Sequence, residues 1–129
     1  MWFDEFADTI LFGCGRTLFF NRIVAPRFLN RAGDLAAADS AERDELPTIL
    51  AYLESVAPEG DGYLVGDSLT LADIAVASPF ANLVHANVEL DEQRYPKTLA
   101  FTRRILSRPS FAPWIARETA FLQKVAAQA

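Results

Sequence analysis

Hydrophobic residues along most of this chain recur at the spacing of α-helices. The first run extends from about Trp2 to about Ile23 and predicts one long helix. Gly13 and Gly15 interrupt it at a cost in helix stability, so we expect a close neighbour or a ligand to need the space they leave. The sequence APRF at 25–28 should end or bend the helix, because proline removes a backbone donor. The predicted apolar stripe contains Phe3, Phe6, Ala7, Ile10, Leu11, Cys14 and Leu18.

A second helix is predicted from about Asp39 to about Val56. Asp39 and Glu42 have the spacing of a capping pair, which favours a helix start there. Pro47 should bend this helix. Its buried face is predicted to consist of Leu46, Ile49, Leu50 and Leu53.

The rest of the chain is also helical in pattern, since only GYLVG at 62–66 reads as briefly extended. Helices are predicted at 70–86, at 96–107 and from 109–110 onward, the last carrying Phe111, Trp114, Ile115 and Phe121. Pro96 suits the first turn of its helix. The sequence therefore predicts an all-α bundle of about five helices, with the first long helix bent near Gly13–Pro26.

Four residues agree on the start of the third helix. Thr70 and Asp73 have the spacing of a capping box, in which each side chain accepts a hydrogen bond from the other residue's backbone. Leu69 and Ile74 stand where a hydrophobic staple places its two apolar residues. A catalytic or metal-binding role for Asp73 lacks partners, because no His or second acid lies within a turn of it. We interpret all four residues as structural.

Composition and charge limit the possible functions. The 129 residues suffice for one domain. No apolar run is long enough for a membrane span and the start is acidic, so we expect a soluble, cytoplasmic protein. Residues 34–92 carry 13 acids and one base, whereas residues 93–129 carry seven bases and one acid, which indicates oppositely charged faces. The net charge of −5 disfavours nucleic acid as a partner.

Residues with reactive side chains occur singly. Cys14, the sole cysteine, excludes an internal disulfide and a multi-thiolate metal site, and is typical of inert packing. His85 has no second His or nearby Cys to complete a metal site. No tyrosine has an adjacent base. We therefore expect no catalytic residue, no bound metal and no cofactor within this chain.

The run GYLVGDSLTLADIAVASPF resembles the start of the core helix in the C-terminal helical domain of cytosolic glutathione S-transferases. WFDEFADT is similar to the first long helix of that domain, and RILSRPSFAPWIARE to its penultimate and last helices. The resemblance thus extends over nearly the whole chain, and residues 1–129 are expected to form one such domain.

The resemblance implies that a thioredoxin-like N-terminal domain, absent from this chain, binds the co-substrate glutathione and activates its thiol. Two explanations stay open: a fragment of a longer transferase, which Trp2 and Phe3 favour, or a solitary helical domain. Either way, we expect the chain alone to be inactive.

The resemblance implies that the helical domain forms the wall of the pocket for a small hydrophobic electrophile and contributes to a homodimer. It also implies that the enzyme functions in detoxification. The wall would fall on Phe6, Ile10, Gly13 and Cys14, because positions i, i+4 and i+7 share a helix face. The same residues could be core or dimer contacts.

Two other interpretations remain. Similar helical domains occur in translation factors and aminoacyl-tRNA synthetases as non-catalytic protein-interaction modules, and the charge division fits such docking equally well. A solitary domain that stores or senses a hydrophobic ligand has no specific residue in its favour.

Overall fold

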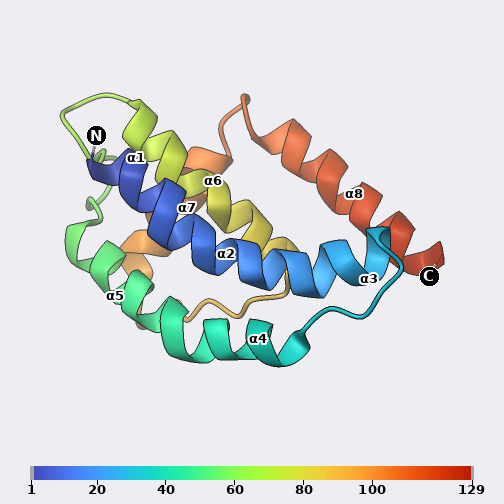
Figure 1. The fold of residues 1–129 in the computed structure, drawn as a ribbon. Coiled ribbons are helices and arrows are strands. Elements are labelled where there is room, and N and C mark those ends of the chain that lie inside the picture. Colours follow the sequence, from blue (N-terminus) through green and yellow to red (C-terminus); the bar gives the residue numbers. More distant parts are fainter. Residues whose placement is uncertain (1, 129) are drawn as a thin grey trace.

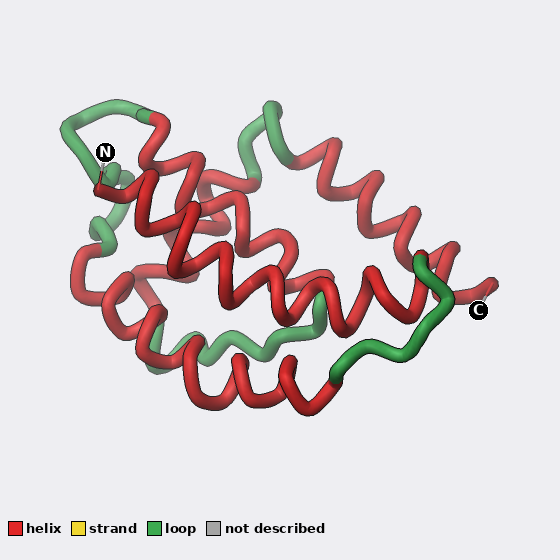
Figure 2. The backbone as a smooth tube through the Cα atoms, viewed as in Figure 1, coloured by secondary structure: helices red, strands yellow, loops and turns green. Residues whose placement is uncertain are grey.

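The computed structural model describes residues 2–128, and every regular element within them is a helix (Figure 2). The first long helix consists of α1 (Trp2–Phe6), the π-helical turn η1 (Ala7–Leu11), α2 (Phe12–Phe19), the π-helical turn η2 (Phe20–Val24) and α3 (Ala25–Phe28). The second consists of α4 (Leu35–Ser40), the π-helical turn η3 (Ala41–Glu45) and α5 (Leu46–Val56). The bundle is completed by α6 (Leu71–His85), α7 (Pro96–Leu106) and α8 (Ala112–Gln128). The predicted all-α bundle of five helices is confirmed.

The first long helix crosses the front of the molecule and packs against α6 (Figure 1). The α4–α5 helix passes below it, and α8 reaches toward the end of α3. The buried core lies between these helices, with Phe80, Leu53 and Ile105 among its fully enclosed side chains. No helix within residues 2–128 is both long and apolar enough to span a bilayer.

A π-helical turn precedes each of two prolines, Pro26 and Pro47. Each proline stands in the first turn of the α-helix that follows, directly after η2 or η3. A proline inside a helix has no N–H for the carbonyl four residues earlier, and its ring crowds that carbonyl. A wider turn accommodates this conflict. The first helix therefore continues to Phe28 instead of ending near Ile23.

The π-helical turns also change which residues of the first helix face the core. Ala7, Leu11, Cys14 and Leu18 are buried at ordinary helical spacing, and Phe6 joins them five residues before Leu11 across η1, as Ile23 does five residues after Leu18 across η2. A uniform helical repeat predicts Ile10 on the buried stripe, but its side chain is 47% exposed. Ile10, which the sequence places on the apolar stripe, therefore lies on the solvent side of the first helix.

The second long helix begins earlier than the sequence predicts. Its N-cap is Asp34, whose side chain accepts a hydrogen bond from the Ala37 N–H at 2.9 Å. Asp39 and Glu42 instead form ion pairs with Arg22, at 2.9 and 2.6 Å. These two acids thus join the second helix to the first. The predicted buried face, Leu46, Ile49, Leu50 and Leu53, is confirmed.

The start of α6 is as the sequence predicts. Thr70 is the N-cap, and the reciprocal arrangement of a capping box with Asp73 is present. The fully buried Asp73 carboxylate accepts from the Thr70 N–H at 2.8 Å, and also from the Leu64 N–H at 2.9 Å. Asp73 therefore fixes the preceding loop as well as the helix end. The predicted start of α7 at Pro96 is confirmed, while α8 begins at Ala112, three residues after Pro109.

Candidate functional site

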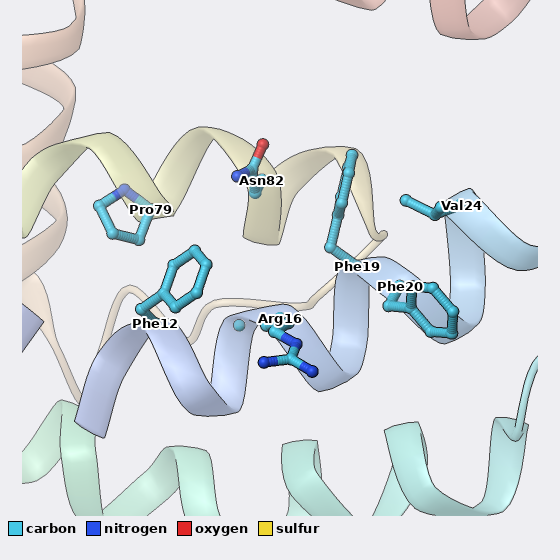
Figure 3. A pocket seen from close by; sticks show the side chains of 8 residues that line it. Phe12, Arg16, Phe19, Phe20, Val24, Pro79 and Asn82 are labelled. Atoms are coloured by element: carbon cyan, nitrogen blue, oxygen red, sulfur yellow. The ribbon is translucent and has the colours of Figure 1, made fainter. Parts of the chain in front are cut away.

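A hollow of about 150 Å³ lies between the first long helix and α6 (Figure 3). The rings of Phe12 and Phe19 extend from the first helix toward Pro79 and Asn82 on α6, and Arg16 lies between the two rings along the helix. The hollow is lined by Phe12, Gly15, Arg16, Phe19, Phe20, Val24, Pro79 and Asn82. It is therefore an aromatic hollow with one arginine in its lining, whose guanidinium extends away from Pro79 and Asn82 in this view (Figure 3).

Helical spacing brings these residues together. Phe12, Arg16 and Phe19 stand at i, i+4 and i+7 and so share a face of the first helix. Gly15 lies where the first helix packs on α6, since a Cβ built on it would lie 3.8 Å from the Leu83 side chain. On α6, Pro79 and Asn82 are three residues apart and face the same side.

The side chains of this hollow are incompletely covered. Phe12 is 51% exposed, and Phe19 and Phe20 are half-buried. The Arg31 guanidinium lies 5.7 Å from the centre of the Phe20 ring, within the range of a cation–π contact. Arg16 is exposed and makes no ion pair with any residue in 2–128. The hollow thus combines apolar surface with positive charge.

A second hollow adjoins the first and shares Phe19 and Asn82 with it. Its volume is about 290 Å³, and it lies between α3, α6 and α8. There the rings of Phe28 and Phe121 stack with their centres 5.8 Å apart. Aromatic surface therefore continues from the first helix to α8.

The first long helix separates the four predicted wall residues into two pairs. Phe6 and Cys14 are buried in the core, where the Phe6 ring packs 5.1 Å from that of Tyr52. Ile10 and Gly13 lie on the solvent side, and a Cβ built on Gly13 meets no atom within 4 Å. The expected close neighbour of Gly13 is thus absent from residues 2–128. These four residues do not share one face.

The Cys14 thiol is held in an unreactive form. Its Sγ lies 3.8 Å from the Ala41 carbonyl oxygen, inside the core. Burial, together with the negative charges of Glu45 and Glu42, raises the pKa of Cys14 to about 11. A thiol with this pKa is protonated at neutral pH and is a poor nucleophile.

His85 contacts an acidic residue on α8. Its Nε2 lies 3.1 Å from Glu118 Oε2, which links the end of α6 to α8. Within residues 2–128, no group of three or more His, Cys, Asp and Glu side chains is placed to hold a metal ion.

The residues of the aromatic hollow were missed by the prediction from sequence. The signal was present in FGCGRTLFFN, where aromatic residues recur at i, i+7 and i+8 around an arginine. Core periodicity accounts for Leu11, Cys14 and Leu18 but leaves Phe12 and Phe19 on the other side of the helix. Large apolar residues outside the core stripe are the feature that points to a site.

Comparison with known proteins agrees with this architecture. Residues 19–118 match the family described as glutathione S-transferase, C-terminal domain. The chain is 39% identical over 56 residues to "Probable glutathione S-transferase 7" and 34% identical over 77 residues to "Glutathione S-transferase 3", both of Caenorhabditis elegans. These alignments cover 43% and 57% of this chain but only 27% and 37% of the relatives. No solved structure gives a significant match.

Proposed function

Because this chain belongs to the glutathione S-transferase C-terminal domain family, we propose that it forms the hydrophobic wall of an electrophile site in a glutathione transferase-like enzyme. The observation that carries the proposal is the aromatic hollow between the first long helix and α6. Pockets for small molecules are concave and mainly apolar, with a few polar groups that orient the ligand, as the hollow is. Ile10 and Gly13 flank its helix on the solvent side, whereas the burial of Phe6 and Cys14 leaves them only an indirect, packing role.

The proposal divides the reaction between two domains. A thioredoxin-like N-terminal domain supplies glutathione and activates its thiol, and the helical domain formed by this chain positions the electrophile. Catalysis then consists of lowering the thiol pKa and aligning the two substrates. We place the complete enzyme in the cytoplasm as a homodimer with a detoxifying role, by analogy with the family.

Calorimetry on the chain alone tests this division. Glutathione should give no measurable heat of binding, and no conjugation should exceed the uncatalysed rate. A neutral hydrophobic aromatic compound should bind weakly, because the hollow keeps one wall of the pocket. Phe19→Ala should weaken that binding, whereas Trp114→Ala, an exposed aromatic on α8, should leave it unchanged. Saturable glutathione binding to these residues, or hydrophobe binding insensitive to Phe19→Ala, contradicts the proposal.

A non-catalytic interaction module is the second candidate, and the exposed aromatic residues at α3 and α8 favour it. Trp114 and Phe121 are 60% and 54% exposed, and Arg117 lies 4.8 Å from the centre of the Trp114 ring. Aromatic and arginine residues are enriched at protein interfaces. Under this alternative, Trp114→Ala would weaken capture of a protein partner and Phe19→Ala would not.

A further inference from the structure

The volume of the aromatic hollow between the first long helix and α6 is sufficient for one ring. An apolar cavity of about 150 Å³ in a protein accepts benzene, and the hollow between the first long helix and α6 has about this volume. Phenylalanine rings favour aromatic ligands over aliphatic ones, because offset or edge-on ring pairs add to the burial of apolar area. Phe12, Phe19 and Phe20 supply such rings.

The lining of the hollow carries positive charge. Arg16 is the one charged side chain among the described residues that line it. Residues 9–33, which include all of α2 and α3, contain four arginines and no acid. Of these arginines, Arg22 is neutralised by Asp39 and Glu42, whereas Arg16 pairs with no acid within residues 2–128.

A guanidinium beside an apolar pocket has a definite chemical preference. Its planar fork of N–H donors matches a carboxylate, and such charge-assisted hydrogen bonds are stronger than neutral ones. The Asn82 amide, on the opposite wall, offers a further donor.

We propose that the hollow binds a single-ring aromatic compound that carries a carboxylate or a similar anionic group, and that Arg16 is the residue that selects the charge. This inference rests on the proposed function, since it defines the class of electrophile. It makes Arg16 a specificity residue, while the phenylalanines provide affinity for any aromatic ring.

Titration followed by NMR, with 4-chlorobenzoate and its neutral analogue 4-chlorobenzamide as probes, tests the proposal on the 129-residue chain. The benzoate should bind about tenfold more tightly than the benzamide at low salt, as one charge-assisted hydrogen bond provides. Added salt should reduce this difference, because Arg16 is exposed. Arg16→Gln should remove the difference by weakening the benzoate alone, and Arg16→Lys should restore part of it. The matched control is Arg117→Gln on α8, which should change neither affinity.

The outcomes separate this inference from the proposed function. Equal binding of the two probes to the unaltered chain, with Phe19→Ala weakening both, overturns the charge preference and leaves the electrophile wall standing. If Arg16→Gln binds neither probe although its melting temperature is unchanged, the result contradicts a role for Arg16 in selecting charge. Failure of both probes to bind overturns this inference and the proposed function together.

Discussion

The Glu54 carboxylate caps the N-terminus of α7 by accepting the Thr98 backbone N–H at 2.9 Å. It also accepts the Lys97 N–H at 3.1 Å and the Thr98 hydroxyl at 2.9 Å. These N–H groups belong to the first turn of α7 and have no partner inside the helix. The side chain that satisfies them comes from α5, so this cap joins two helices that are distant in sequence.

Removing this cap should destabilise the fold. Glu54→Gln leaves the first turn of α7 with a weaker acceptor and without the negative charge that the helix dipole favours. We expect a loss of roughly 0.5–2 kcal/mol, as for other capping residues. Chemical denaturation measures it. Glu59→Gln is the control, because Glu59 contacts the Lys97 side chain at 3.1 Å but is 80% exposed, and it should cost little.

The Glu54 cap should also make stability depend on pH. Partial burial alone raises the pKa of Glu54, but the hydrogen bonds from Thr98 and Lys97 outweigh it and lower the pKa from 4.5. The pKa of Glu54 is thus lower in the folded protein than in the unfolded chain. The stabilisation is therefore complete when the pH is above the pKa in the unfolded chain, and it is lost as the pH falls through the pKa in the folded protein. The free energy of unfolding, measured from pH 6 to pH 3, should therefore fall more steeply for the unaltered chain than for Glu54→Gln. Parallel curves would contradict this assignment.

Asp73 should contribute more to stability than its partner Thr70. Thr70→Ala removes one capping side chain, at a cost of roughly 0.5–2 kcal/mol. Asp73→Ala leaves the Thr70 and Leu64 N–H groups without their acceptor, and each buried unsatisfied donor costs about 1–3 kcal/mol. The double variant should lose less stability than the sum of the two single variants, because in a capping box each side chain accepts a hydrogen bond from the other residue's backbone N–H.

Hydrogen exchange distinguishes the two roles of Asp73. The Leu64 amide should lose protection in Asp73→Ala and keep it in Thr70→Ala, since Leu64 donates to Asp73. Equal protection in both variants would show that Asp73 does not hold the loop.

The sequence predicts the helices because periodicity and capping are local properties. Thr70 with Asp73, and Pro96 at the start of α7, lie within a few residues of what they determine, and all were predicted correctly. Glu54 was not recognised as a cap because its partner Thr98 is 44 residues away. A side chain that acts across the bundle leaves no local pattern.

Phe6, Ile10 and Gly13, predicted to share one helix face, do not share one in the structure, and the π-helical turn η1 is the reason. The positions Phe6, Ile10 and Gly13 share a face only if the helix is uniform. Because η1 lies between Phe6 and Gly13, Phe6 lies on the core side with Leu11 and Cys14, whereas Gly13 lies on the solvent side. No proline follows η1 closely, so nothing local in the sequence signals this turn.

Gly13→Ala should stabilise the protein. Gly13 lies within α2, where glycine costs about 1 kcal/mol relative to alanine, and an added Cβ meets no atom within 4 Å. We expect a gain of about 0.5–1 kcal/mol in thermal or chemical unfolding. Gly33→Ala is the contrasting variant, since its Cβ would overlap the Asn21 carbonyl oxygen, and it should destabilise the protein. A loss of stability in Gly13→Ala would show that the space beside it is used.

Cys14 should not react with electrophiles in the folded protein. Because burial, together with Glu45 and Glu42, raises its pKa to about 11, only about one thiol in a thousand is ionised at pH 8. Ellman's reagent should therefore modify native Cys14 at least about 100-fold more slowly than the same thiol in urea. The control is Ser68→Cys in a Cys14→Ala background, which places the thiol in an exposed loop and should react at the rate of a free thiol. If native Cys14 reacted as fast as that control, its side chain would reach solvent, and the core position that separates it from the aromatic hollow would be wrong.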